Sequence, residues 1–572
     1  MKTLTQPRGG PRAVLLHQVF GGLEGAGGIG GSIVVGLDRE NRVVLVRADV
    51  VRSPHLATRS RLRAVDALRA VSGAALKVAG SRGEWIEFAG GSFPAPSFAR
   101  PVAFPLGDAG ARPAFEVDFT RRLDDRTRTI VDAVTGEVLY RSSLVWGEAP
   151  EGRVFRNYPG APKGGQHELV SFAGDPIASP NGWFSAIRGV ELPTTNGNNA
   201  DTAAHWGLLP AVIAPEGLGQ IRPVGVSGVF DFAFPDAWAK SECGKLPIEG
   251  GFPDAPTYAL DTLPAIVNLF YHHNLMHDFW YRLGFDELAG AMQVSNFGKT
   301  GAGRENDPLI GMAQAGALGG DGPFGLSLGR DNAYMATSAD GLPSWSAMFL
   351  YEPLPAVFEA LCRDGDLDTG IIYHEYAHAP TNRWVGGEIG NLNGYHGGSM
   401  GEGWADFFAA HYIHLVGLGS NTNTANYTTG NLKRGDRNWE MADVTAGFAD
   451  LAFGLRGAEV HDDGEIWSGT MWAIRSALER ARPNGAQLAG QLMADAMPIS
   501  GPSPTMLDMR DAILAADVAR TRGANQALLW QEFAHRGFGK SASAVDDNDS
   551  DPIPAYDHAD PQRNGVIEGR VV

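Results

Sequence analysis

The chain has 572 residues, and hydrophobic residues make up 44% of it, a normal proportion for globular proteins that argues against a mainly disordered or fibrous chain. Its formal net charge of −18 would repel a phosphate backbone on average, so nucleic acid is not an expected partner. No run of about 18 apolar residues occurs, so no membrane span is expected. The two cysteines, Cys243 and Cys362, can form at most one disulfide, and the sequence leaves open whether they pair.

The first 150 residues are predicted to form a small α+β domain. Two β-branched runs within Ser32–Val51 indicate two strands around a turn, and Thr135–Gly136 marks the turn of a second hairpin. Apolar residues recur at helical spacing from Leu62 to Val71. Near the N-terminus, the apolar run Ala13–Leu16 is shorter than the roughly 7–15 residues of a secretory signal, so there is no clear signal peptide.

The rest of the chain is predicted to be β-rich first and helical afterwards. Residues 151–365 are rich in Gly, Pro and Asn with short apolar runs, apart from a helical pattern over Thr262–Phe285. Residues 366–540 carry most of the helical periodicity, and residues 541–572 contain little apolar material and are predicted to be a tail or linker. Helices are predicted over Gly370–Arg383, Gly401–Leu415, Glu465–Ala481, Thr505–Thr521 and Asn525–Arg536. The predicted fold class is therefore α+β.

The sequence His374-Glu375-Tyr376-Ala377-His378 is the strongest chemical signal in the chain. Residues four apart on a helix point the same way, so the two imidazoles can bind one zinc ion. Glu375 lies between them and can reach a water molecule on that metal. The pattern predicts a hydrolytic zinc site.

A catalytic zinc ion needs a third protein ligand and one open position. Glu402 follows His378 by 24 residues and begins an apolar helical stretch, so a returning helix can bring it to the metal. Asp406 lies one turn after Glu402 and is predicted to accept the free imidazole N–H of His374, as outer carboxylates often do for zinc histidines.

These two motifs together resemble those of the fungalysin family of secreted zinc metallopeptidases, which are relatives of thermolysin. Three further segments are similar to segments of that family: Asn268–Phe285, Asp331–Pro343 and Val460–Trp467. The resemblance covers residues from about 155 to 540 and implies a β-rich part and a helical part with the zinc helix between them.

The resemblance also implies the roles of individual residues. His374, His378 and Glu402 would hold Zn²⁺. Glu375 would be the general base that takes a proton from the zinc-activated water and passes it to the leaving amine. His461 would hydrogen-bond the oxyanion that forms on the substrate, a contact typically worth roughly 3–4 kcal/mol.

Other implied roles concern positioning and substrate binding. Glu459 would orient His461, Asn332 and Ala333 would pair with the substrate backbone, and Arg437 would lie near the substrate carbonyl. One departure from the family pattern is Pro380 shortly after the second histidine. Because proline cannot donate to the carbonyl four residues earlier, we expect the zinc helix to kink or end there.

The segment Asp132–Leu139 is similar to the last hairpin of the family's propeptide. Residues 1–150 would then assist folding, cover the active site as an intramolecular inhibitor and be removed, which makes the chain a zymogen. A permanent accessory domain is the alternative. The resemblance further implies an extracellular monomer, and a possible calcium ion whose site the sequence does not indicate.

Three other patterns lack the context that their chemistry requires. Gly25–Gly30 satisfies GxGxxG, but a strand pattern follows it where a dinucleotide fold needs a helix. Gly397–Gly401 satisfies GxSxG, but it is expected to be a flexible loop that lets Glu402 approach the metal, with no strand before it. A helix-spaced histidine cluster, which is expected to pack in the core, comprises His272, His273 and His277.

The sequence therefore predicts a secreted zinc metalloendopeptidase that cleaves proteins or peptides. By resemblance alone, it would prefer a hydrophobic side chain after the scissile bond. The alternatives are a catalytically inactive relative that binds peptides or surfaces, an aminopeptidase of the same zinc class, and a serine hydrolase.

Overall fold

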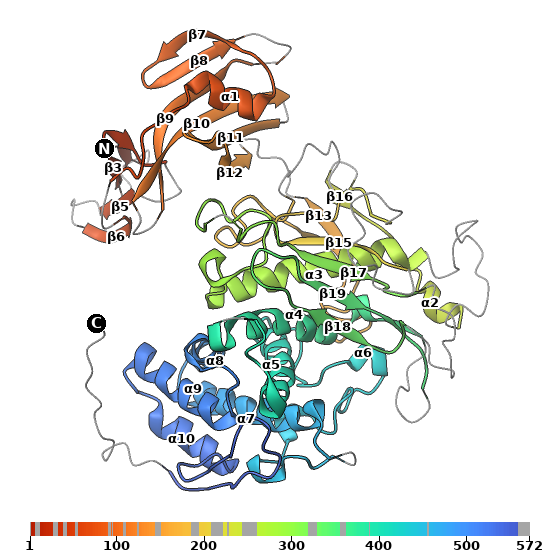
Figure 1. The fold of residues 1–572 in the computed structure, drawn as a ribbon. Helices are drawn as coiled ribbons and strands as arrows, with labels where there is room; N and C mark the ends of the chain where they lie inside the picture. Colours follow the sequence, from red (N-terminus) through yellow and green to blue (C-terminus); the bar gives the residue numbers. More distant parts are fainter. Residues whose placement is uncertain are drawn as a thin grey trace. The chain divides into compact units, whose positions relative to one another are not determined.

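The computed structural model shows a chain of two compact units (Figure 1). Unit 1 comprises Met1–Ala149 and Ser295–Gly301, and unit 2 comprises Pro150–Val294 and Ala302–Val572. The structure describes residues 2–5, 12–26, 32–37, 43–51, 55–89, 93, 95–106, 110–122, 125–143, 150–184, 194–206, 221–225, 228–242, 260–301, 303–317, 329–354, 362–387, 389–454 and 457–558.

The described residues of unit 1 form two larger antiparallel sheets, a small hairpin and the helix α1. The four-stranded sheet has the order β1-β2-β5-β6, with bounds Lys2–Thr5, Arg12–His17, Ser32–Leu37 and Val43–Asp49. The six-stranded sheet has the order β12-β11-β10-β9-β8-β7, with bounds Val138–Ser143, Asp125–Asp132, Ala111–Arg122, Ser97–Pro105, Trp85–Ala89 and Lys77–Arg82. A small hairpin pairs β3 (Val19–Phe20) with β4 (Leu23–Glu24). Helix α1 (Ala64–Ser72) buries its apolar face, including Leu68 and Val71, against the larger sheet.

The β-rich part of unit 2 contains two further sheets. The three-stranded sheet has the order β14-β13-β16, with bounds Glu168–Ser171, Glu151–Val154 and Val229–Phe230. The four-stranded sheet has the order β15-β17-β19-β18, with bounds Ala200–Ala204, Leu309–Ala313, Trp345–Met348 and Ala333–Ala336. Strands β15, β17 and β19 are parallel, whereas β18 is an antiparallel edge strand. Two short strands, β20 (Leu350–Tyr351) and β21 (Arg363–Asp364), pair with each other.

Most of the buried residues in the main hydrophobic cluster of unit 2 come from helices that gather in its C-terminal part (Figure 1). These helices are α4 (Thr369–Trp384), α5 (Gly394–Leu415), α7 (Val460–Ala481), α8 (Gly485–Ala496), α9 (Met506–Thr521) and α10 (Gln526–His535). Helix α3 (Thr262–Leu283) is buried along most of its length and packs on β15, β17 and α4, so several of its polar side chains, including His272 and His273, are buried as well. The other helices are α2 (Ala237–Lys240) and α6 (Asn426–Thr429). Helix α4 contacts β18 and β19 of the sheet as well as α5. It therefore joins the β-rich part to the helical part.

Helix α4 was expected to kink or end at Pro380, and it does not end there but continues to Trp384, one residue past the predicted helix Gly370–Arg383. The proline removes one donor, and the Thr381 hydroxyl donates to the neighbouring Ala377 carbonyl at 3.1 Å. Arg383 then holds the last turn, because it donates to Asp307 at 2.9 Å and to the Gly290 carbonyl at 2.7 Å. Tertiary contacts thus outweigh the local cost of the proline.

The expectation of a flexible glycine loop before Glu402 is also wrong, because α5 begins at Gly394 and includes the whole segment. The glycines there serve close packing rather than flexibility. A β-carbon at Gly398 would lie 2.8 Å from Val460 Cγ1, and one at Gly397 would lie 3.1 Å from the Leu392 carbonyl carbon. Helix α7 likewise begins five residues before the predicted start at Glu465.

Part of the segment predicted to be a tail packs on unit 2. The Asp547 carbonyl accepts a hydrogen bond from the His396 amide at 2.8 Å, and His396 Nε2 lies 2.7 Å from the Asp549 carbonyl. Of the helices that the structure describes, none has the length and apolar character of a membrane span. Cys362 is disulfide-bonded, and Cys243 lies outside the described residues.

Candidate metal centre

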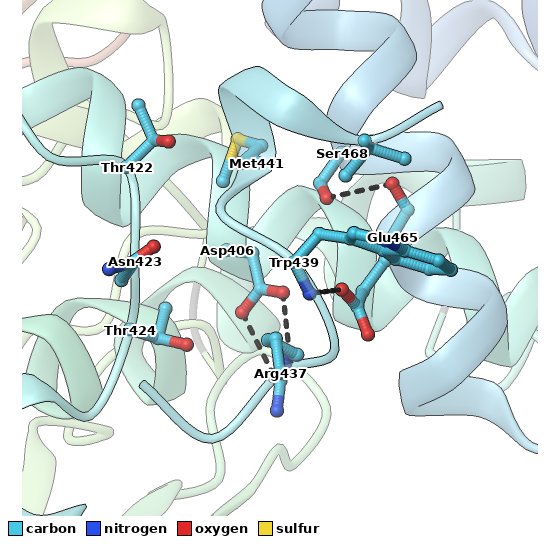
Figure 2. A pocket seen from close by; sticks show the side chains of 10 residues that line it. Asp406, Thr422, Asn423, Thr424, Arg437, Trp439, Met441, Glu465 and Ser468 are labelled. Atoms are coloured by element: carbon cyan, nitrogen blue, oxygen red, sulfur yellow. Dashed lines mark hydrogen bonds and ion pairs between the residues drawn. The ribbon is translucent and has the colours of Figure 1, made fainter. Parts of the chain in front are cut away.

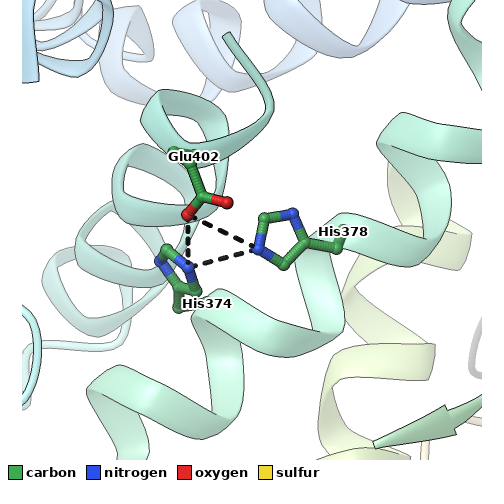
Figure 3. Close-up of side chains that lie close together, drawn as sticks. All are labelled: His374, His378 and Glu402. Atoms are coloured by element: carbon green, nitrogen blue, oxygen red, sulfur yellow. Dashed lines mark hydrogen bonds and ion pairs between the residues drawn. The ribbon is translucent and has the colours of Figure 1, made fainter. Parts of the chain in front are cut away.

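Helices α4 and α5 bring three potential metal ligands together (Figure 3). His374 and His378 lie one turn apart on α4, and their Nε2 atoms are 3.2 Å apart. Glu402 Oε2 on α5 lies 3.1 Å from His374 Nε2 and 3.8 Å from His378 Nε2. All three ligand atoms lie within 4.8 Å of one another, and no other such group of histidine, cysteine or acidic side chains occurs among the described residues.

Asp406 lies one turn after Glu402 and orients the first histidine. Its Oδ1 atom is 2.8 Å from His374 Nδ1, so the predicted contact is present and His374 Nε2 is left facing Glu402. Arg437 holds the same carboxylate with two hydrogen bonds, from Nε at 2.8 Å and from Nη2 at 2.9 Å. Arg437 therefore fixes the carboxylate that orients His374, and it also lines the cleft.

The electrostatics of this cluster favour a bound cation. Burial opposes charge on His374, yet the carboxylates of Asp406 and Glu402 outweigh it and raise the pKa of His374 to about 10. Burial lowers the pKa of His378 to about 4. Burial would raise the pKa of Glu402, but His378 and His374 hold it well below its usual range. A carboxylate that stays ionised and two imidazoles aimed at one point fit the donor set that Zn²⁺ prefers.

Glu375 points into the same cleft from α4 but is not part of the ligand cluster. The residue is 7% exposed, and burial raises the pKa of its carboxyl group to about 7. A carboxyl group with a pKa near neutrality can both accept and return a proton, which is the property of a general base and acid.

His461 lies in the first turn of α7 and also approaches Glu402. Its Nε2 atom is 3.5 Å from Glu402 Oε2, and half of its side chain is exposed. Glu459 is the N-cap of α7, since its carboxylate accepts from the His461 and Asp462 amides at 2.9 Å. The same carboxylate lies 2.7 Å from His461 Nδ1, so Glu459 fixes the direction in which Nε2 points.

The close approach of α5 and α7 depends on two glycines. A β-carbon at Gly464 would lie 2.9 Å from Glu402 Cβ, and one at Gly403 would lie 2.5 Å from the Gly464 carbonyl oxygen. Only glycine fits at these two positions without moving the helices apart. The sequence GEG around Glu402 therefore allows α7 to carry His461 to the metal ligands.

The cluster opens into a cleft of about 450 Å³. Asn332 and Ala333 line it at the start of the edge strand β18, whose outer side is not paired with another described strand. The full lining is Asn332, Ala333, Tyr334, Met335, Tyr351, Ile371, His374, Glu375, His378, Asn382, Glu402, Thr424, Asp436, Arg437 and His461. Seven of these residues were not predicted from the sequence: Tyr334, Met335, Tyr351, Ile371, Asn382, Thr424 and Asp436. Ile371, one turn before Glu375, and Asn382, one turn after His378, could have been found from helical spacing on α4.

A second, very small cavity lies behind Arg437 (Figure 2). It measures about 10 Å³, room for about one water molecule, and Asp406, Arg437 and Glu465 line it. Glu465 accepts hydrogen bonds at 2.9 Å from the Asn438 and Trp439 amides. These contacts fix the loop that follows Arg437. The small cavity is therefore part of the packing that holds Arg437 and Asp406 beside the metal ligands.

The three sequence patterns that lacked the required context lie outside the metal cluster. Ser399 lies inside α5, where its hydroxyl donates to the Tyr395 carbonyl at 2.9 Å. His272 lies between Tyr373 Oη and the Phe155 carbonyl, each at 2.8 Å, within the core. The segment Gly25–Gly30 falls partly outside the described residues, and β5 follows it.

Comparison with known proteins places this site in a family. The sequence matches the family described as fungalysin metallopeptidase (M36) over residues 153–542, which is more than half of the chain. The chain belongs to the fungalysin family. This family match covers the metal cluster, the edge strand and α7.

The curated relatives that the sequence matches are named as extracellular metalloproteinases. Extracellular metalloproteinase 5 of Trichophyton rubrum is 31% identical over 405 residues, which cover 67% of this chain and 57% of that protein. Extracellular metalloproteinase mep of Aspergillus flavus is 31% identical over 450 residues, which cover 72% of this chain and 62% of that protein. The matched region thus spans about three fifths of the length of these relatives.

Proposed function

We propose that this fungalysin-family chain is a zinc metalloendopeptidase that hydrolyses peptide bonds within proteins or peptides. The observation that carries the proposal is the convergence of His374, His378 and Glu402 with Asp406 behind His374. The family match and the names of the curated relatives support the same class of reaction. Ala333, Tyr334 and Met335 of the edge strand β18 line the cleft, so an extended peptide in it would lie along this strand.

The three ligands would hold zinc, which when bound would lower the pKa of a water molecule to about 7 and polarise the scissile carbonyl. Glu375 then accepts the proton of the attacking water and returns it to the leaving amine. His461 donates from Nε2 to the oxyanion of the substrate, in an orientation that Glu459 maintains. Arg437 keeps Asp406 in place and so keeps His374 directed at the metal.

Substrate binding and maturation belong to the same proposal. Asn332 and Ala333 pair with the substrate backbone at the open edge of β18. Residues 1–150 form a propeptide-like domain that inhibits the enzyme until it is removed, followed by the β-rich part to residue 365, the helical part to residue 540 and the tail. The names of the relatives support an extracellular enzyme, and we propose that it acts as a monomer.

The test is hydrolysis of casein by the purified full-length chain and by any fragment that it releases on incubation. Activity should be lost with 1,10-phenanthroline, return with zinc and be absent in Glu375→Gln. Glu532→Gln, a matched change on α10 outside the cleft lining, should retain it. Zinc bound at one per chain without turnover would overturn the proposal in favour of an inactive relative. Hydrolysis that resists the chelator but not a serine-directed reagent would show another catalytic centre.

A further inference from the structure

One end of the cleft is formed by α4 and two loops that meet beside it. Ile371 lies one turn before Glu375 on α4 and lines the cleft, as do Thr424 and Asp436. The loop with Thr424 packs on the start of α4, because a β-carbon at Gly370 would lie 3.4 Å from Thr424 Cα. The Thr424 hydroxyl donates to Asp436 Oδ1 at 2.7 Å and so holds the second loop to the first.

The carboxylate of Asp436 reaches solvent at this end of the cleft. The guanidinium group of Arg437 contacts two carboxylates, Asp406 through Nε and Nη2 and Asp436 through Nη1 at 3.0 Å. Asp406 has a second cationic partner, because His374 Nδ1 lies 2.8 Å from its Oδ1 atom. The side chain of Asp406 is 3% exposed, whereas that of Asp436 is 32% exposed, so Asp436 is the carboxylate that a substrate side chain can reach from solvent. Among the described residues that line the cleft, Arg437 is the only lysine or arginine.

We infer that this end of the cleft binds a lysine or arginine side chain of the substrate, next to the scissile bond, and that Asp436 selects it. The inference rests on the proposed peptidase function and names the substrate class of that site. Ile371 and Tyr351 offer apolar surface to the methylene stem, and Asp436 accepts from the charged head. This departs from the hydrophobic preference that the family resemblance implies.

The experiment uses the zinc-loaded, active protein and quenched fluorescent peptides that differ at one residue on either side of the scissile bond. That residue is lysine, Nε-acetyl-lysine, norleucine or glutamate. We expect kcat/KM for lysine to exceed that for norleucine by about tenfold at one of the two positions, as a charge-assisted hydrogen bond would give. Acetylation should remove the advantage, and glutamate should be the poorest. Equal or better cleavage of norleucine at both positions would overturn the inference.

A variant then assigns the preference to Asp436. Asp436→Asn keeps an oxygen that can accept from Thr424 but removes the charge, so the ratio of kcat/KM for lysine over norleucine should fall towards one. Glu532→Gln should leave that ratio unchanged. A uniform loss for all peptides in Asp436→Asn would overturn the selective role and show that Asp436 acts only by positioning Arg437.

The lysine and acetyl-lysine comparison in the unaltered protein keeps the inference falsifiable if Asp436→Asn does not fold. Failure of the proposed function gives a different result, because no peptide of the series would then be cleaved in a zinc-dependent manner. Cleavage of norleucine peptides without preference for lysine would leave the peptidase assignment intact and reject only the role of Asp436.

Discussion

Two buried helices of unit 2 carry histidines with the same spacing, but among the described residues only one pair belongs to a potential metal cluster. His374 and His378 on α4 direct their Nε2 atoms at each other and at Glu402. His273 and His277 on α3 are also four residues apart, yet they are not part of any potential metal cluster among the described residues. Helical spacing thus produces candidates, and another property decides between them.

The deciding property is whether a carboxylate from elsewhere reaches the histidines. Burial lowers the pKa of His273 to about 3, and both of its ring nitrogens are buried without a hydrogen-bond partner among the described residues. His277 has a carboxylate at 3.1 Å, but it belongs to the adjacent Asp278. That carboxylate also accepts from Ser179 Oγ at 2.6 Å and Trp183 Nε1 at 2.8 Å. On α4 the carboxylates come from a second helix and favour a cation.

The largest effect is expected when the carboxylate of Glu402 is neutralised. The histidines of α4 would then lack this ligand from α5, as the histidines of α3 do. Glu402→Gln should lower zinc content from one per chain to well below one, because the only anionic ligand is lost. Hydrolysis should fall by more than about a hundredfold, beyond the usual cost of losing an outer-shell partner. Metal analysis after dialysis, with a parallel peptidase assay, measures both. Full zinc occupancy in the variant would show that Glu402 is not a ligand.

A smaller effect is expected from the carboxylate that only orients a histidine. Asp406→Asn keeps the shape but weakens the hold on His374 Nδ1 and on Arg437. Zinc affinity or activity should fall by about 10–100-fold. Competition with a chromogenic zinc chelator gives the affinity. Binding as tight as in the unaltered chain would mean that the packing of α4 alone orients His374.

The smallest effect concerns the α3 pair and appears as pH dependence of stability. The pKa of His273 is lowered to about 3 from 6.5, so the unfolded chain binds a proton there that the folded chain does not. Its contribution to stability is complete above pH 6.5 and is lost as the pH falls towards 3, by at most about 1.4 kcal/mol per pH unit. His273→Phe removes this term, so the unfolding midpoint of the variant should decline less steeply than that of the unaltered chain between pH 6.5 and pH 4.5.

The same variant tests the comparison directly. His273→Phe should retain one zinc per chain, since His273 is outside the metal cluster. Differential scanning calorimetry on both proteins at matched pH cancels the protonation of the α4 histidines, which they share. Parallel pH profiles would show that His273 titrates normally in the folded state. Loss of zinc from the variant would show that the α3 pair supports a metal after all.

Much of the metal site could be predicted, because its residues come in pairs that lie close together in the sequence. One helical turn separates His374 from His378, and one turn separates Glu402 from Asp406, so each pair is encoded by spacing. The start of α5 could not be predicted, because glycines disfavour a helix unless packing against Leu392 and Val460 requires them.

The contact between Thr424 and Asp436 at one end of the cleft could not be predicted from the sequence either. Asp436 and Thr424 are twelve residues apart in loops, and neither lies in a periodic pattern. A β-carbon at Gly435 would lie only 1.6 Å from the Thr424 carbonyl oxygen, so the two loops meet at a glycine. Their contact depends on the path of the whole segment between α5 and α7, which no local signal specifies.

The sequence by itself determined which side chains are available for chemistry, the α+β character of the chain and its family. Helical periodicity and turn residues act over a few positions, so they are readable without a fold. Only the tertiary structure decided how closely the carboxylates of α5 approach the α4 histidines and where the carboxylate of Asp436 reaches solvent. Those outcomes depend on contacts between elements far apart in the chain, and only the packing of α4, α5 and α7 in one core brings these elements together.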